Sequence, residues 1–464
     1  MTAARLGLLA LVLGVSGCAD VLDIRTSRFL AEGGDGRCTG TLRVRVLSDL
    51  TGSTRDVGVP AHKGVTDALR EIAQAGGIRG CPLEVEVGDT KYDVETTLAV
   101  YREWTSKPDW SEVSTVFAMG TPMIQALGPL LADEQKLLMS TALNGQHASP
   151  IPRELDVGVP SLSRTFVPAT VPVRKRSPGY PFVFFQGTDY TTQARIAMSS
   201  AWKGGATRVA FFACTTSAFC TDPVDGAKSF LTTLGGTKVG RDLAIELTDD
   251  EATVLSKVDD FAREELAKKT SDPTYTVADW VWFGNSNTTL VHLGRALAAV
   301  KKSRGWSPKV ITNNWSLDET LYPACGDACL GITGIHPYPV FGDRSSPGMQ
   351  RVLDLHAASR AADGEPATAY ATLQYVYGVV AVGTWRAAVE DALDAGKRPD
   401  GLALKDALER FAQRSIENLG AISYSTRDHR PQSSARLYTL AAGGKLQQVG
   451  QPVSIALQPD WLGW

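Results

Sequence analysis

The stretch TLRVRVLSDLTGS, residues 41–53, decides the fold of this 464-residue chain. Its first eight residues are rich in β-branched and apolar side chains, which predicts a strand over 41–48. A turn at 50–53 leads into a helix expected over about 59–75, and Gly76-Gly77 ends that helix as C-terminal glycines do. A short strand followed directly by a helix is the repeating unit of a parallel α/β sheet.

The same alternation continues and predicts a first α/β lobe. Strands are expected at 83–87 and 114–119, with a helix at 95–104 between them. Gly120-Thr121-Pro122 opens a further helix, because proline is favoured at an early helical position. The free backbone N–H groups at such a strand-to-helix turn suit a polar ligand group.

A proline-rich, basic segment then interrupts the pattern. Pro168, Pro172, Pro178 and Pro181 surround Arg174-Lys175-Arg176, and we interpret this segment as the first hinge. A phosphate site built on the three basic residues is the alternative, although exposed basic runs are usually solvated loops.

A second α/β lobe is expected beyond this hinge, followed by a return to the first. The second lobe contains expected strands at 182–185, 208–212, 280–283, 310–312 and 331–335, and expected helices at 191–202, 224–234 and 290–303. The return contains expected helices at 348–363, 370–396 and 401–414, and a terminal hairpin at 437–440 and 446–449.

The N-terminus has the layout of a bacterial lipoprotein signal. Arg5 supplies the positive charge, residues 7–15 an apolar run, and Ser16-Gly17 two small residues before Cys18. A membrane-spanning anchor is the alternative, but the apolar run is well short of the ~20 residues that cross a bilayer. We therefore expect residues 1–17 to be removed, Cys18 to be lipidated in the cell envelope, and residues 18–38 to form a tether.

Export changes how the other cysteines are interpreted. Of seven cysteines, six remain beside Cys18, an even number in a compartment where disulfides persist. Two pairs close in sequence are expected to clamp single loops: Cys214 with Cys220, and Cys325 with Cys329. A zinc site formed by Cys325, Cys329 and His336 is the alternative, but its spacing is not a standard ligand pattern.

Cys38 and Cys81 are left for each other. Both lie just before strands that are expected to be parallel neighbours ~4.8 Å apart in the first sheet. That separation fits the Cα spacing of a disulfide.

Composition and motifs exclude several function classes. A net charge of −3 does not provide the basic surface that nucleic-acid binding requires. The segment 284–288 (GNSNT) lacks the final glycine of a nucleophile elbow, and the sequence contains no phosphate-loop or His-Glu-x-x-His motif. We therefore expect a protein that is not an enzyme and that holds no metal or cofactor.

Several short motifs occur in one order along the chain. They are Thr51-Gly52, residues 75–80 (AGGIRG), Asp89, Gly120-Thr121, residues 139–144 (MSTALN) and residues 420–424 (GAISY). In order and spacing they resemble type I periplasmic solute-binding proteins, specifically the branched-chain amino-acid-binding branch of ABC uptake systems. The resemblance implies a Venus-flytrap fold in which two Rossmann-like lobes with parallel sheets, joined by three crossings, close over a solute. The expected lobes are 39–180 with 340–430, and 181–339 with 431–464.

The resemblance also implies a ligand site between the lobes. From the first lobe it places Thr121 and the turn from Ala142 to Asn144 at the solute. From the second lobe it places Asp189, Tyr190, Phe219, and Phe283 to Asn285 there, although core packing is an equal expectation for Phe283.

The chain departs from the family where a carboxylate holds the α-ammonium of an amino acid. After the strand expected at 310–312 it has Asn313, Asn314, Trp315 and Ser316 instead, of which Asn314 and Trp315 are expected to contact the solute. We therefore expect a small polar, aromatic or amide solute rather than leucine, isoleucine or valine. The expected partner is an ABC permease, and the expected state is a monomer. A regulator of another envelope protein and a solute-sensing receptor component are the alternatives.

Overall fold

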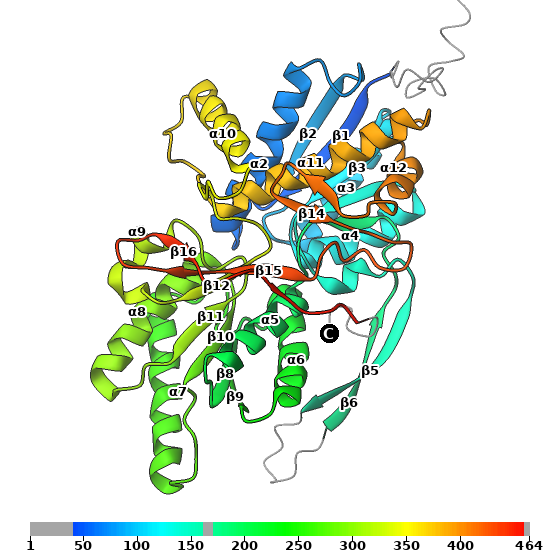
Figure 1. The fold of residues 1–464 in the computed structure, drawn as a ribbon. Coiled ribbons are helices and arrows are strands. Elements are labelled where there is room, and N and C mark those ends of the chain that lie inside the picture. Colours follow the sequence, from blue (N-terminus) through cyan, green and yellow to red (C-terminus); the bar gives the residue numbers. More distant parts are fainter. Residues whose placement is uncertain (1–39, 161–169, 459–464) are drawn as a thin grey trace, which may run out of the picture.

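The computed structural model describes residues 40–160 and 170–458, which form two α/β lobes (Figure 1). The α/β fold class with parallel sheets in two lobes is therefore confirmed. The expected signal peptide over 1–17, the lipidation site Cys18, the tether over 18–38 and Cys38 lie outside the described residues.

The first lobe is built on five parallel strands in the order β2-β1-β3-β4-β7. Their bounds are β1 Leu42–Ser48, β2 Leu83–Asp89, β3 Val113–Ala118, β4 Leu137–Ser140 and β7 Val183–Phe185. β1 and β2 pair from Leu42 opposite Leu83 to Ser48 opposite Asp89. Successive side chains of β1 point to opposite faces, so Val46 and Leu47 pack in different cores.

Helices cover both faces of this sheet. One face carries α2 Arg55–Gln74, α10 Met349–Asp363, α11 Leu373–Asp394 and α12 Gly401–Leu408, and the other carries α3 Val94–Thr105 and α4 Thr121–Asp133. α2 and α11 cross closely through two glycines. A Cβ on Gly64 would lie 2.1 Å from the carbonyl oxygen of Tyr375, and one on Gly378 would lie 2.3 Å from that of Ala61.

The second lobe contains a sheet in the order β16-β15-β12-β11-β10-β8-β9, with β17 also paired to β15. The bounds are β8 Arg208–Ala213, β9 Lys238–Ala244, β10 Trp280–Gly284, β11 Lys309–Thr312, β12 Thr333–His336, β15 Ser434–Leu440, β16 Leu446–Gln448 and β17 Val453–Ser454. α5 Tyr190–Lys203 and α6 Ala218–Leu234 cover one face, and α7 Glu251–Ser271, α8 Asn287–Arg304 and α9 Leu321–Cys325 cover the other.

Three crossings of the chain join the lobes. They run through residues 186–189 between β7 and α5, 337–348 between β12 and α10, and 423–433 between β14 and β15. β13 Arg414–Ile416 and β14 Gly420–Ile422 form a small hairpin beside α11. α12 ends at Leu408, so the final helix is shorter than the one expected over 401–414. Three short 3-10 turns complete the elements: η1 Trp110–Glu112, η2 Gly145–Ala148 and η3 Gly326–Cys329.

The expected start of the second lobe is wrong. Residues 183–185 form β7, which pairs with β4 in the first sheet, so the first crossing follows this strand instead of preceding it. The proline-rich segment is not the hinge either. Residues 170–177 form β6 Thr170–Ser177, which pairs with β5 Arg153–Pro160 in a two-stranded hairpin. Both strands of a lone hairpin are edge strands, where proline is tolerated.

The two short-range disulfides are confirmed. Cys214 bonds Cys220 with their Cα atoms 5.4 Å apart, and Cys325 bonds Cys329 with theirs 5.8 Å apart. The zinc alternative for Cys325 and Cys329 is therefore wrong. Cys81 is also disulfide-bonded. Within residues 40–160 and 170–458, no helix combines the length and the apolar character that crossing a bilayer requires.

Candidate functional site

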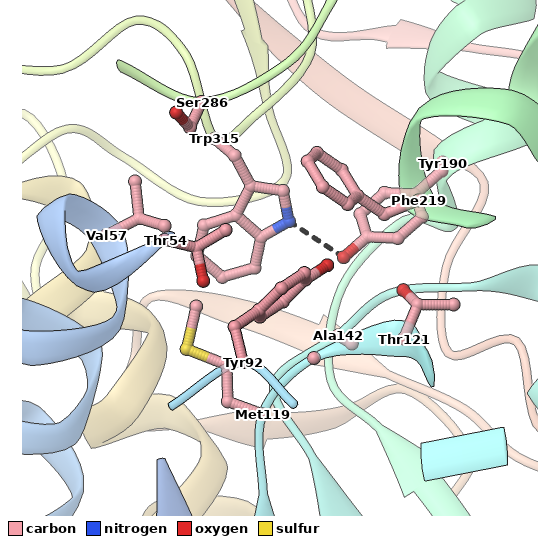
Figure 2. A pocket seen from close by; sticks show the side chains of 11 residues that line it. Thr54, Val57, Tyr92, Met119, Thr121, Ala142, Tyr190, Phe219, Ser286 and Trp315 are labelled. Atoms are coloured by element: carbon pink, nitrogen blue, oxygen red, sulfur yellow. Dashed lines mark hydrogen bonds between the residues drawn. The ribbon is translucent and has the colours of Figure 1, made fainter. Parts of the chain in front are cut away.

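A cavity with an empty volume of about 310 Å³ lies between the lobes. It sits beyond the carboxyl ends of the parallel strands, where ligands bind in open α/β sheets. Figure 2 shows side chains from both lobes converging on it. The lining residues are Thr54, Val57, Tyr92, Met119, Gly120, Thr121, Ala142, Tyr190, Phe219, Ser286 and Trp315.

The turn from β3 into α4 supplies one wall. Gly120 has φ +99°, and a Cβ there would lie 2.1 Å from the Met123 Cε and 3.2 Å from a ring carbon of Tyr92. The backbone conformation therefore favours glycine, whereas the end of the Met123 side chain can move aside. Next to it, the buried Thr121 begins α4, a helix that has no side-chain cap. Its Oγ1 has no hydrogen-bond partner within the usual geometric limits.

Tyr92 reaches the cavity from a strained turn after β2. Lys91 and Tyr92 have φ values of +52° and +53°, a left-handed conformation that side chains rarely adopt. Asp89 holds this turn by accepting hydrogen bonds from the backbone N–H of Lys91 at 2.9 Å and of Leu50 at 3.0 Å. The strain directs the Tyr92 ring at the cavity, as strained residues at binding sites often do.

Three aromatic residues form the wall contributed by the second lobe. The Trp315 indole Nε1 donates a hydrogen bond to the Tyr190 hydroxyl at 2.7 Å (Figure 2). The Tyr190 and Phe219 rings meet edge to face with centroids 6.4 Å apart. Burial raises the pKa of Tyr190 to about 12, so its hydroxyl is neutral at physiological pH. The wall is therefore apolar, with polar groups at its edge.

The field at the cavity favours a negative or hydrogen-bond-accepting group. The helices α4 and α8 both begin at lining residues, and their first N–H groups have no partner inside the helix. At α8 the Asp56 carboxylate already accepts a hydrogen bond from the Thr288 N–H, so α4 has the freer N-terminus. The buried Ser286 Oγ, just before α8, has no hydrogen-bond partner under the same limits as Thr121 Oγ1. None of the lining residues, all within 40–160 and 170–458, carries a charged side chain.

Hydrogen bonds across the cleft hold the lobes together around this cavity. The hydroxyls of Tyr92 and Ser217 are 2.7 Å apart. The Asp56 carboxylate, on α2, accepts hydrogen bonds from the backbone N–H and the hydroxyl of Thr288 at the start of α8, both at 2.8 Å. The lobes are therefore in a closed arrangement.

A third cross-lobe contact is centred on Asp222 of α6. It accepts hydrogen bonds from the Asn144 amide at 2.7 Å and from the Gln146 amide at 2.8 Å. Both amides follow β4 of the first lobe, so this carboxylate joins one lobe to the other at the rim of the cavity.

Five of the ten ligand-binding residues expected from the sequence line the cavity. They are Thr121, Ala142, Tyr190, Phe219 and Trp315. The other five lie elsewhere. Asn144 contacts Asp222 at the cleft rim, and Asp189 caps α5 by accepting from the Thr192 N–H at 2.9 Å. Phe283 is fully buried in the core between the sheet and α7 and α8.

The two remaining expected residues are buried asparagines behind the cavity. Asn285 donates to the carbonyl oxygen of Ile245 at 2.7 Å and accepts from the Ser286 N–H at 2.8 Å. Asn314 is completely buried and faces the Tyr377 hydroxyl, whose pKa is raised mainly by burial and lowered somewhat by Asn314. Neither asparagine is a lining residue.

Sequence reasoning did not identify Thr54, Tyr92, Met119 and Ser286 as lining residues. Met119 directly follows β3, and Tyr92 lies in the turn after β2. A position at the carboxyl end of a parallel strand predicts a residue near the ligand, and both residues could have been identified on that ground. Ser286 belongs to a segment that was considered only as a nucleophile elbow.

Three buried acids close to the cleft do not line the cavity. Asp49 accepts hydrogen bonds from the backbone N–H and the hydroxyl of the lining residue Thr54, both at 2.8 Å. Asp318 accepts hydrogen bonds from Asn287 at 3.0 Å and from the backbone N–H of Thr320 at 2.8 Å. Burial raises its pKa to about 6. Neither Asp318 nor Asp189 lines the cavity, so neither replaces the carboxylate that the family uses to hold an ammonium group.

Comparisons with known proteins agree with this geometry. A family described as periplasmic binding protein matches residues 41–445, and it is a family of binding proteins rather than enzymes. No curated protein sequence matches the chain.

Solved structures with the same fold include three from different organisms. A substrate-binding protein of an ABC transporter from Aeropyrum pernix is 24% identical with a TM-score of 0.71, over 91% of this chain and 98% of that one. A branched-chain amino acid ABC transporter protein with bound valine, from Thermus thermophilus, is 16% identical (TM-score 0.69; 90% and 97%). A fatty acid ABC transporter substrate-binding protein from Thermomonospora curvata is 15% identical (TM-score 0.67; 91% and 95%). Because the family match extends over most of the sequence, the chain belongs to the periplasmic binding protein family.

Proposed function

We propose that the protein is the solute-binding component of an ABC uptake system, and that it captures a small organic acid or amide with an apolar or aromatic body. The observation that carries this proposal is the uncharged, aromatic-lined cavity between two closed lobes. The solute's body packs against Trp315 and Phe219, and its acceptor head group faces Thr121 and Ser286.

Helix N-termini support an acceptor head group. Backbone N–H groups at a helix start, together with the aligned peptide dipoles, stabilise a carboxylate or a carbonyl oxygen. Among the described residues the Ser286 hydroxyl has no partner and supplies a further donor, and the Thr121 hydroxyl, which lies near the Tyr190 hydroxyl, supplies another. The space left between the closed lobes is small, which favours a compact solute.

An ammonium group is disfavoured in the same cavity. Removing a cation from water costs several kcal/mol unless a carboxylate pairs with it. A cation–π contact with the Trp315 ring returns only about 2 kcal/mol in a desolvated site. We therefore propose that leucine, isoleucine and valine bind weakly, although structurally similar proteins are described as binding branched-chain amino acids.

Matched solutes test this proposal. Leucine and 4-methylpentanoate differ only in the amino group, as do phenylalanine and 3-phenylpropanoate, and each acid has a corresponding amide. Calorimetry is expected to show each deaminated acid or its amide binding at least about tenfold more tightly than the amino acid, a difference of ~1.4 kcal/mol. Leucine as the tightest ligand would contradict the proposal.

A matched pair of variants tests the head-group contact. Thr121→Val removes the hydroxyl at nearly constant volume and is expected to weaken binding of the best acid about fivefold to tenfold. Thr233→Val makes the same change on the exposed surface of α6 and is expected to leave binding unchanged. Equal affinities in the two variants would place the head group elsewhere.

We also propose that the protein is held in the cell envelope by a lipid on Cys18, with residues 18–38 as a tether to its permease. The small residues Ser16 and Gly17 before the cysteine support this. Mass spectrometry of the native N-terminus is expected to show an acylated Cys18, and an unmodified N-terminus at another residue would contradict it.

A further inference from the structure

We propose that the Cys214–Cys220 disulfide is a positioning element of the solute site: it fixes the loop over 215–219 that forms one wall of the cavity and closes the cleft. This role rests on the proposed function, because a fixed cavity wall matters only if the cavity binds a solute. The geometry of the loop carries the inference.

The disulfide joins the end of a strand to the start of a helix. Cys214 directly follows β8, and Cys220 lies in the first turn of α6, and both are buried. The five residues between them include two that act at the cleft. Phe219 lines the cavity, and the Ser217 hydroxyl contacts the Tyr92 hydroxyl of the other lobe at 2.7 Å.

The loop has two anchors, the disulfide and the Glu246 carboxylate, which accepts hydrogen bonds from the hydroxyls of Thr215 and Thr216. Of the two, the disulfide lies next to Phe219. Ser217 is the N-cap residue of α6, but its side chain makes no capping hydrogen bond and contacts Tyr92 instead. A hollow of about 650 Å³ lies next to the loop on the side of β9, lined among others by Cys214, Thr215 and Thr221. The backbone N–H and the hydroxyl of Thr215 both donate hydrogen bonds to the Glu246 carboxylate.

The second disulfide provides a control within the same lobe. Cys325 and Cys329 clamp α9 and η3 against α8, where a Cβ on Gly294 would lie 2.2 Å from the Cys329 sulfur. Neither cysteine lines the cavity between the lobes. Removing this bridge perturbs a buried part of the second lobe without touching the cleft.

Hydrogen exchange without added solute tests the proposal. The double variant Cys214→Ala/Cys220→Ala is expected to exchange about tenfold faster over 215–222, because local opening costs less. It is also expected to exchange faster over 88–93, around Tyr92 in the other lobe. That response across the cleft is one that a merely local loss of structure does not produce.

The matched double variant Cys325→Ala/Cys329→Ala is expected to leave both segments as in the wild type. Graded reduction of the native protein, with the reduced fraction read from its mass, provides the same comparison without mutation. Unchanged exchange around Tyr92, equal changes in both double variants, or global unfolding on reduction would each overturn the proposal. Because no solute is present, these outcomes are distinct from failure of the proposed solute class.

Discussion

His147 is a buried residue whose charge state couples folding to pH. Its ring lies edge to face against Tyr180 with centroids 5.0 Å apart, and neither ring nitrogen has a hydrogen-bond partner within the described residues. Burial lowers its pKa to about 3. An unfolded histidine titrates near ~6.5, so between these values the unfolded chain binds the proton and the folded protein does not. Stability is therefore lost as the pH falls below ~6.5.

Replacing this side chain is expected to remove part of that pH dependence. We compare the free energies of unfolding of His147→Leu and the wild type, measured by urea denaturation. When the pH falls from 7 to 5, this difference is expected to shift by about 2 kcal/mol in favour of the variant. The absolute difference at pH 7 reports packing against Tyr180 and is not part of the prediction. An identical difference at both pH values would show that His147 is accessible to protons in the folded protein.

At the scale of single residues, strand ends were predictable and side-chain directions were not. Thr121 and Ala142 follow strands β3 and β4 and line the cavity as expected. Asp189 and Asn285 also follow strands, but their short polar side chains hydrogen-bond the neighbouring backbone instead. Short polar residues commonly make such local bonds. The sequence pattern does not distinguish a side chain that caps a helix from one that faces a solute.

At the scale of elements, the crossing of α2 and α11 shows how closely two helices of the first lobe approach. The Gly64 and Gly378 positions bring backbone against backbone, and a Cβ on Gly378 would also lie 2.6 Å from the Val65 nitrogen. Gly378→Ala is expected to lower the free energy of unfolding by about 1–3 kcal/mol, because helix backbones cannot move aside as side chains do.

A second glycine on α11 provides the control for helix propensity. A Cβ on Gly383 would meet the Glu417 side chain at 2.8 Å, and that side chain ends in flexible bonds. Gly383→Ala gains the same propensity of ~1 kcal/mol and is expected to be less destabilising than Gly378→Ala, because it meets side chains rather than backbone. Equal destabilisation of both variants in denaturant titrations would contradict the distinction.

Most elements of the parallel sheets were predicted, while β4, β9 and α7 were not. β4 has only four residues. β9 is an edge strand, and α7 buries only one narrow stripe, with Val254, Val258, Phe261, Ala262 and Glu265 buried among its 21 residues. Neither has the strong apolar pattern of a central element. Assigning 183–185 to the wrong lobe has a different cause. Strand partners are set by contacts far along the chain, and a local pattern does not contain them.

At the scale of the whole molecule, closure depends on a few polar contacts at the cleft rim. Asp222→Ala removes the acceptor for the Asn144 and Gln146 amides, and hydrogen bonds to a charged group contribute about 1.5–3 kcal/mol each when well shielded. The ligand-free variant is expected to shift toward an open form, seen as a larger radius of gyration by small-angle scattering.

Asp242→Ala is the control for this shift. Asp242 pairs with Lys228 at 2.6 Å inside the second lobe, so its loss is expected to leave the scattering profile unchanged. Identical profiles for the wild type and both variants would show that the rim contacts do not hold the lobes closed.

The β5–β6 hairpin gives the molecule a mechanical link beyond its three crossings. Its chain leaves and re-enters the first lobe, between β4 and β7, yet β5 lies against α6 of the second lobe (Figure 1). Any rotation that separates the lobes must slide α6 along this strand or pull it away. The hairpin thus adds a non-covalent connection between the lobes, and opening of the cleft must either break it or shift it.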